Sequence, residues 1–260
     1  MKLKINYMEE YMNTKNKVKL ILDTVMSVLF ITFFNKNLIS FKFHIVSGLI
    51  FGLFIAIHII LNRKWVINVS KRLFDKKFKL RTKISYLLNV LLFVSVVLII
   101  VSGMFIMKAP NYDRVMFWKM IHFGVSYLSL GLIGIHMGLY WNWIMNMLKK
   151  VFKVKINNKT NKIISSLLVV ITLLFGAYTI YTQNYFGKTY SCLEYAVQHI
   201  KPQDIEGENS YYVEVEKPSF VNVVTTYGSI ISVFSIATYY LDKRLKSNKL
   251  KEINENKSIA

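Results

Sequence analysis

Long apolar runs constrain this chain more than any other feature, because about 20 apolar residues let a helix cross a bilayer. The sequence of 260 residues is 53% hydrophobic. We predict an all-α fold, an integral membrane bundle of six transmembrane helices. The first run is short and carries Asp23, the one acidic residue within any predicted span. The expected spans cover about residues 20–34 (continuing toward 41), 43–61, 84–107, 120 to beyond 140, 163–182 and 219–241.

Positive charge is distributed unevenly between the two sides of the predicted bundle. Of 34 Lys and Arg residues, 26 fall in segments on one side and 8 in segments on the other. Lys and Arg concentrate in cytoplasmic segments, so we expect a multi-pass protein of the plasma membrane with both termini cytoplasmic. The net charge of +20 is therefore interpreted as a topology signal and a contact with anionic lipid, not with nucleic acid.

An internal repeat occupies the first four predicted helices. His44 and His58 have thirteen residues between them, and His122 and His136 repeat this spacing 78 positions later. A tryptophan and a basic segment follow each copy. We predict a four-helix domain over residues 1–156, with repeats at about 20–74 and 84–152. Residues 157–260 would add two more transmembrane helices and an acidic, Tyr-rich outer loop at 183–218.

The histidine spacing predicts two separate sites. Fourteen residues of helix span about 21 Å and return to nearly the same face. The two histidine helices should run parallel, so His44 would face His122 near the outer surface and His58 would face His136 near the inner surface. Two imidazoles on opposite sides of an iron porphyrin form a bis-histidine haem b suited to electron transfer. The simpler alternative is that each histidine is a hydrogen-bonded packing residue.

The surroundings of the histidines agree with two buried sites. Phe51 and Ser129 occupy the midpoint between them, and the Ser129 hydroxyl is expected to bond back to the carbonyl of Val125. Asp23 is a candidate hydrogen-bond acceptor for an inner histidine. The fifth histidine, His199, has no partner in the repeat and is interpreted as a surface residue.

The segments HIVSGLIFGLFIAIHIILNRKW and WKMIHFGVSYLSLGLIGIHMGLYWNW resemble the paired segments of the DUF4405 family, the flavinylation-associated cytochromes. The histidine scheme is also similar to that of cytochrome b and the ferric reductase domain. The resemblance covers about residues 19–152. It implies two non-covalent haems b, with ligands at all four paired histidine positions, and electron transfer toward extracytoplasmic flavoproteins.

Missing motifs limit the function further. The chain has no glycine-rich dinucleotide fingerprint and no flavinylation-type segment, and its single cysteine, Cys192, excludes an internal disulfide and a thiolate iron–sulfur cluster. We therefore expect an electron-transfer subunit between a membrane or cytoplasmic donor, such as quinol, and an extracytoplasmic acceptor, such as a flavoprotein. Whether it is an enzyme in its own right stays open. The alternatives are a ferric-reductase-like enzyme and a haem-anchored scaffold subunit. The 183–218 loop is interpreted either as a docking surface or as a solvated cap.

Overall fold

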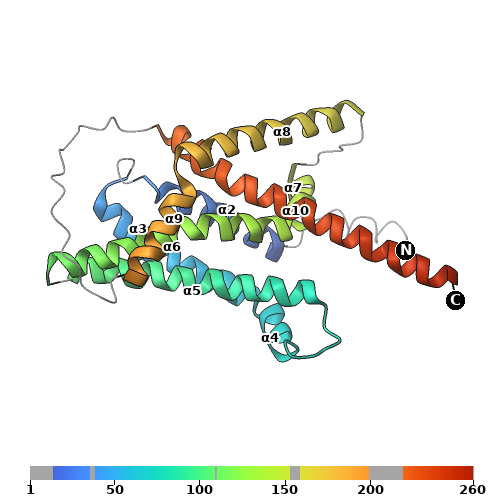
Figure 1. Ribbon diagram of the computed structural model, residues 1–260, viewed down its shortest axis with the longest axis horizontal. Helices are drawn as coiled ribbons and strands as arrows, with labels where there is room; N and C mark the ends of the chain where they lie inside the picture. Colours follow the sequence, from blue (N-terminus) through green and yellow to red (C-terminus); the bar gives the residue numbers. More distant parts are fainter. Residues whose placement is uncertain (1–13, 36–38, 109, 153–158, 199–218, 260) are drawn as a thin grey trace.

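The structure, a computed structural model, describes residues 14–35, 39–108, 110–152, 159–198 and 219–259. These residues form helices and no strands (Figure 1). The helices are α2 (Thr14–Thr32), α3 (Phe41–Leu61), α4 (Arg63–Lys71), α5 (Leu80–Lys108), α6 (Tyr112–Leu139), α7 (Trp141–Phe152), α8 (Lys159–Thr182), α9 (Tyr185–Gln198) and α10 (Phe220–Ile259). The predicted all-helical fold is confirmed.

Five of these helices are long and apolar enough to cross a membrane: α3, α5, α6, α8 and the Phe220–Asn248 part of α10. The predicted count of six is not reached, because α2 does not meet the same standard. Its 19 residues include three lysines in the first six positions, and Asp23 lies further along. Charged side chains inside a membrane helix are costly in hydrocarbon. Helix α2 as a whole is therefore less suited to the bilayer than the apolar run after Lys19 suggests.

Helix α6 lies at the centre of the bundle. It packs closely against α5, α10 and α9, whereas α8 packs mainly on α10 (Figure 1). Glycines line the contact with α10: a Cβ at Gly134 would lie 2.6 Å from the carbonyl of Ile231, and one at Gly138 would lie 2.5 Å from the carbonyl of Ser235. Small residues allow such close backbone approach between membrane helices.

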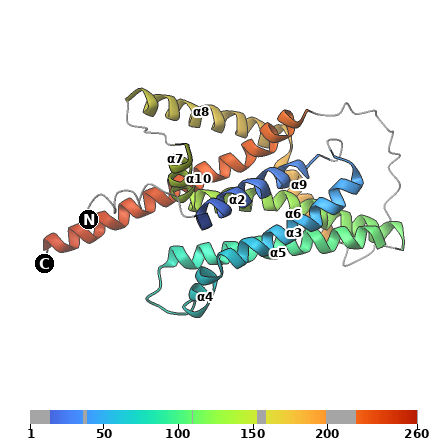
Figure 2. The same cartoon turned by 180° about the vertical axis from the view of Figure 1, so that it is seen from behind.

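The repeat is visible in the way each histidine helix ends. Helix α3 breaks at Asn62 and continues as the short helix α4, and α6 breaks at Tyr140 and continues as α7. Asn62 and Tyr140 are 78 positions apart, the same shift that relates the histidine pairs. Figure 2 shows α2 alongside α3, and α5 alongside α6, so that each histidine helix has its preceding helix as a neighbour.

The predicted outer loop 183–218 begins with a helix. Helix α9 crosses α6 (Figure 1), and its first residue, Tyr185, is only 4% exposed. The Tyr185 ring packs against Tyr127 and Phe234. The start of this helix is therefore packed against the bundle, while Phe186 and Tyr190 further along it are exposed. The rest of the segment, including His199, lies outside the described residues.

Candidate functional site

His44 and His122 lie together, one from each histidine helix. Their ring centroids are 6.0 Å apart, and the ring planes make an angle of 62°. His44 is in the first turn of α3, where its backbone N–H donates to the carbonyl of Ser40. His122 is in the first half of α6. Because the other end of α6, at His136, lies near His58, α3 and α6 run in the same direction, as predicted.

The His122 imidazole is held by its Nδ1 atom. Nδ1 lies 2.9 Å from the carbonyl oxygen of Ile99 and 3.2 Å from the hydroxyl of Ser102, both on α5. The Ser102 hydroxyl donates to the carbonyl of Leu98, so its lone pairs can accept from the imidazole. Because Ile99 offers only an acceptor, Nδ1 carries the proton and Nε2 is left with a free lone pair. This is the tautomer that a metal-binding histidine needs.

His44 is positioned by packing. Its ring makes an edge-type contact with the ring of Phe33, the residue after α2, at 5.3 Å between centroids. Within the described part of the chain its side chain makes no hydrogen bond. One turn along α3, a Cβ at Gly48 would have no other atom within 4 Å, so open space adjoins the His44 side. A Cβ at Gly103 of α5 would lie 3.4 Å from the Cε1 atom of His122, so this glycine adjoins the His122 ring. Both sides of this pair therefore border small residues.

The second pair, His58 and His136, has a polar partner on each ring. Nδ1 of His58 lies 2.7 Å from Oδ1 of Asp23 on α2. Nδ1 of His136 lies 2.8 Å from Oδ1 of Asn89 on α5. The His136 imidazole is close enough to interact electrostatically with both His58 and Asp23. In both rings Nδ1 is occupied by an oxygen acceptor, so the lone pair is on Nε2. Among the described residues, Nε2 of His136 has no hydrogen-bond partner, whereas Nε2 of His58 lies 3.5 Å from the side-chain nitrogen of Asn62.

Asn62 connects this pair to Lys19, near the start of α2. Its side-chain nitrogen donates to the carbonyl of His58 at 2.9 Å and lies 3.5 Å from His58 Nε2. Its side-chain oxygen accepts from the ammonium of Lys19 at 2.6 Å. At the equivalent position of the repeat, Tyr140 packs on the His136 ring, with 4.9 Å between centroids. Both breaks in the histidine helices thus contact the neighbouring histidine.

The region between the two pairs is apolar and closely packed. His44 and His58 belong to one unbroken helix, as do His122 and His136, so the pairs are about 21 Å apart along the bundle. Phe51 is 7% exposed and stacks on Phe30. Ser129 is 1% exposed, and its hydroxyl donates to the carbonyl of Val125, as predicted. No free polar group of Ser129 therefore points between the pairs.

Of the two histidine pairs, His44 and His122 have the ring separation that two ligands of one metal ion require. Two imidazoles on opposite sides of one metal ion, with bonds of about 2 Å, place their centroids about 6 Å apart, and the His44–His122 pair matches that separation. Among the described helices, α3 and α6 do not pack closely against each other. Their backbones are therefore further apart than those of packed helices, and the histidine side chains extend into the space between them. Among the described residues, no group of three or more His, Cys, Asp or Glu side chains could hold a metal ion. An ion bound at either pair would need its remaining ligands from another molecule, and a porphyrin supplies four nitrogens.

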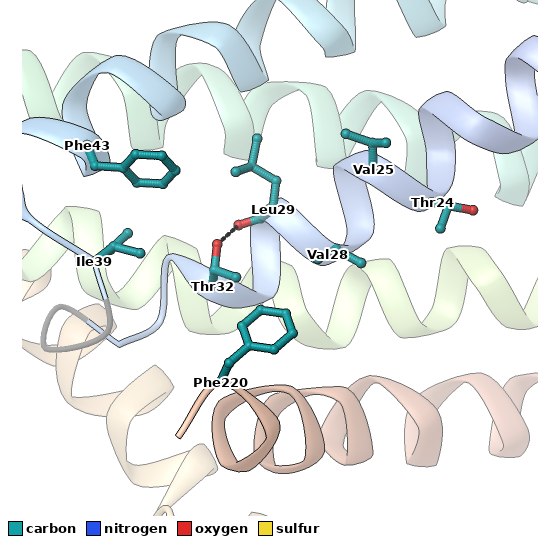
Figure 3. A pocket seen from close by; sticks show the side chains of 8 residues that line it. All are labelled: Thr24, Val25, Val28, Leu29, Thr32, Ile39, Phe43 and Phe220. Atoms are coloured by element: carbon teal, nitrogen blue, oxygen red, sulfur yellow. Dashed lines mark hydrogen bonds between the residues drawn. The ribbon is translucent and has the colours of Figure 1, made fainter. Parts of the chain in front are cut away.

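A cavity of about 550 Å³ is lined mainly by residues of α2, and none of the four histidines lines it (Figure 3). Its polar atoms are already used, because the Thr32 hydroxyl donates to the carbonyl of Leu29 and the Thr24 hydroxyl to that of Leu20. The cavity is open and almost entirely apolar, as expected of a surface that contacts lipid chains. Its lining residues are Thr24, Val25, Val28, Leu29, Thr32, Ile39, Phe43 and Phe220.

Comparison of the chain with protein-family models, curated proteins and solved structures gives no match. The site therefore depends on its own geometry. That geometry adds partners that the sequence interpretation missed: Asn89, the Ile99 carbonyl, Asn62 and Lys19. Asn89 had a recognisable signal, since it is an isolated amide within an apolar run of α5, and polar residues inside membrane helices often serve a site.

Proposed function

We propose that this protein is a transmembrane electron-transfer protein with two bis-histidine haems b. His44 and His122 would hold one, and His58 and His136 the other. The observation that carries the proposal is the 6.0 Å separation of the His44 and His122 rings, with Nδ1 of His122 held by Ile99 so that Nε2 is free. The hydrogen-bond partners of His58 and His136 support the same tautomer at the second pair.

When bound, a haem with two histidine ligands supplies one-electron chemistry and has no open position for a substrate. The residues of this chain fix the two rings in depth and orientation. The three Nδ1 acceptors, Asp23, Asn89 and the Ile99 carbonyl, raise the electron-donating strength of the imidazoles. The apolar region around Phe51 excludes water between the two sites. The chain itself would therefore provide two separate electron carriers aligned across the bilayer.

The resemblance to the DUF4405 family gives this proposal a direction in the cell. A donor in the membrane or cytoplasm, with quinol as the chemical class, would reduce the inner site, and an extracytoplasmic acceptor such as a flavoprotein would be reduced at the outer one. The lysine and arginine asymmetry supports the orientation in which the His44–His122 pair is outer. Membrane lipid would surround the apolar faces of α3, α5 and α8.

The direct test is the haem content of the purified protein. A pyridine haemochrome assay should give about two haems b per chain, extractable by acid acetone. His44→Ala and His122→Ala should remove the same spectral component, and His58→Ala and His136→Ala the other. His199→Ala is the matched control, since this histidine has no place in either pair, and it should retain both components. A protein that stays colourless after reconstitution with haemin would refute the proposal.

Electron transfer across the bilayer is tested with proteoliposomes that contain only this protein. Ferricyanide trapped inside should be reduced by an impermeant reductant outside, and each of the four histidine variants should abolish the reaction. A ferric chelate trapped in place of ferricyanide tests the ferric-reductase alternative. Equal reduction in the His58→Ala variant would mean that the inner pair is not on the path, and transmembrane conduction would be excluded.

A further inference from the structure

We infer that the carboxylate of Asp23 makes the His58–His136 haem the lower-potential one of the two, so that electrons move downhill from the inner site to the outer site. This inference rests on the proposed function, since it assigns a property to haems held by these histidines. It concerns a residue that would touch neither the haem nor a substrate. Asp23 acts through the His58 ring, at 2.7 Å from Nδ1, and is a positioning and tuning residue.

Asp23 and Asn89 lie on corresponding helices of the repeat, although they are 66 and not 78 positions apart. Asp23 lies on α2, the helix before α3, and Asn89 lies on α5, the helix before α6. Each offers its Oδ1 atom to Nδ1 of the histidine near the end of the following helix, at 2.7 and 2.8 Å. The geometry is nearly the same, but one acceptor is an ionisable carboxylate and the other is a neutral amide. The two repeats therefore differ at this site by a charge.

The other pair has only neutral partners. His122 Nδ1 has the carbonyl of Ile99 and the hydroxyl of Ser102, and His44 has the ring of Phe33. Among the described residues, His58 is the paired histidine that contacts an ionisable carboxylate, that of Asp23. The negative charge that distinguishes the His58–His136 site therefore comes from Asp23, and the ammonium of Lys19 is the opposing charge nearby.

A carboxylate that accepts a hydrogen bond from Nδ1–H gives the imidazole imidazolate character and makes Nε2 a stronger donor to iron. Stronger donation stabilises the ferric form, and so does the nearby negative charge, which is weakly screened in a low-dielectric interior. The potential of the inner haem should therefore be lower than that of the outer haem. One electron then passes from the inner iron, which is oxidised, to the outer iron, which is reduced, and no proton is transferred.

Lys19 opposes this effect only in part. Its ammonium is close enough to interact with Asp23 electrostatically, but its hydrogen bond goes to Asn62 and not to the carboxylate. The direct bond from His58 to Asp23 is therefore intact, and Lys19 reduces the field of the carboxylate without replacing it as the acceptor.

The test is a spectroelectrochemical titration of the holoprotein, in which His44→Ala identifies the outer component. Asp23→Asn keeps an oxygen acceptor for Nδ1 but removes the charge, and it should raise the midpoint potential of the lower component alone. Asn89→Asp is the reciprocal variant: it adds a carboxylate at His136 and should lower the same component further. Asp113→Asn makes the same chemical change as Asp23→Asn on an exposed residue of the first turn of α6 and should leave the lower component in place.

Opposite shifts of one component by Asp23→Asn and Asn89→Asp would not arise from a purely structural role. The inference is overturned if Asp23→Asn moves neither component or moves the outer one, or if the inner haem has the higher potential in the native protein. If Asp23→Asn fails to fold, the Asn89→Asp shift still decides, and an unchanged inner potential there refutes the mechanism. Absence of haem from the native protein would instead refute the proposed function.

Discussion

Asn89 gives the sharpest test of how the inner site binds its cofactor. The Nδ1–Oδ1 distance to His136 is 2.8 Å, that of a full hydrogen bond, and both residues are half-buried. Asn89→Leu keeps the size of the side chain but removes the acceptor. Leaving a buried N–H without a partner costs about 1–3 kcal/mol. At about 1.4 kcal/mol for each tenfold change, haem affinity at this site should fall roughly 5- to 150-fold, in line with the ~10–100-fold typical of such partners.

The assay uses a His44→Ala background, in which only the inner site can bind haem through two histidines. Apoprotein is titrated with haemin, and the dissociation constant is obtained from the Soret difference spectrum. The matched control is Asn68→Leu, the same chemical change on an exposed residue of α4. Size-exclusion chromatography shows whether each variant is folded. If Asn89→Leu and Asn68→Leu bind haemin with the same affinity, the hydrogen bond does not support the ligand, and the reasoning fails.

Three further predictions concern packing, orientation and charge. Gly134→Ala places a Cβ against the α10 backbone and should destabilise the protein by about 1–3 kcal/mol. Its melting temperature should fall, whereas that of the control Gly48→Ala should not, and equal melting temperatures of the two variants would contradict the packing. In a cysteine-free background, Asp113→Cys should react with an impermeant thiol reagent in intact cells and Lys77→Cys should not; the reverse pattern would invert the topology. Lys19→Met removes a positive charge near the inner pair and should lower the midpoint potential of the inner haem. This shift is opposite to that expected for Asp23→Asn, and a rise in the potential would contradict the assigned charges.

The pairing of the histidines could be predicted from the sequence because it depends on only two quantities. Thirteen intervening residues place both histidines of a copy on nearly one face of a helix, and the repeat gives both copies the same spacing. Parallel helices then bring His44 to His122. The bond from Ser129 to Val125 could be predicted for the same reason, because it is local to one helix.

The partners of the histidines could not be predicted, because they depend on how neighbouring helices are rotated and how deep they lie. Asp23 was a candidate, but nothing local places it against His58, and Asn89 reaches His136 only through the close contact of α5 with α6. Lipid-facing and protein-facing apolar residues look alike in a membrane helix, so hydrophobic periodicity does not fix the rotation. For the same reason the tyrosines of 183–218 gave no sign that Tyr185 is buried against α6.

The two histidine helices are supported very differently, and this bears on the role of the cofactor. In the apolar window of α6, 39% of residues are buried inside the protein, compared with 11% in α3. Helix α3 packs mainly on α2 and only lightly on α5. Contact with lipid is as favourable for its apolar residues as contact with protein, so burial alone does not hold α3 in one position. Its polar contacts lie near its C-terminal end, where His58 binds Asp23 and Asn62 binds Lys19, whereas His44 is held by ring contacts with Phe33 and His122. On the proposed function, a metal bound by one histidine from each helix sets both the depth and the rotation of α3 relative to α6, since both ligand bonds must form at once. The haems would then carry electrons and also join the two halves of the repeat. Because α6 is already held by α5, α9 and α10, its position would not depend on the haems, whereas that of α3 would.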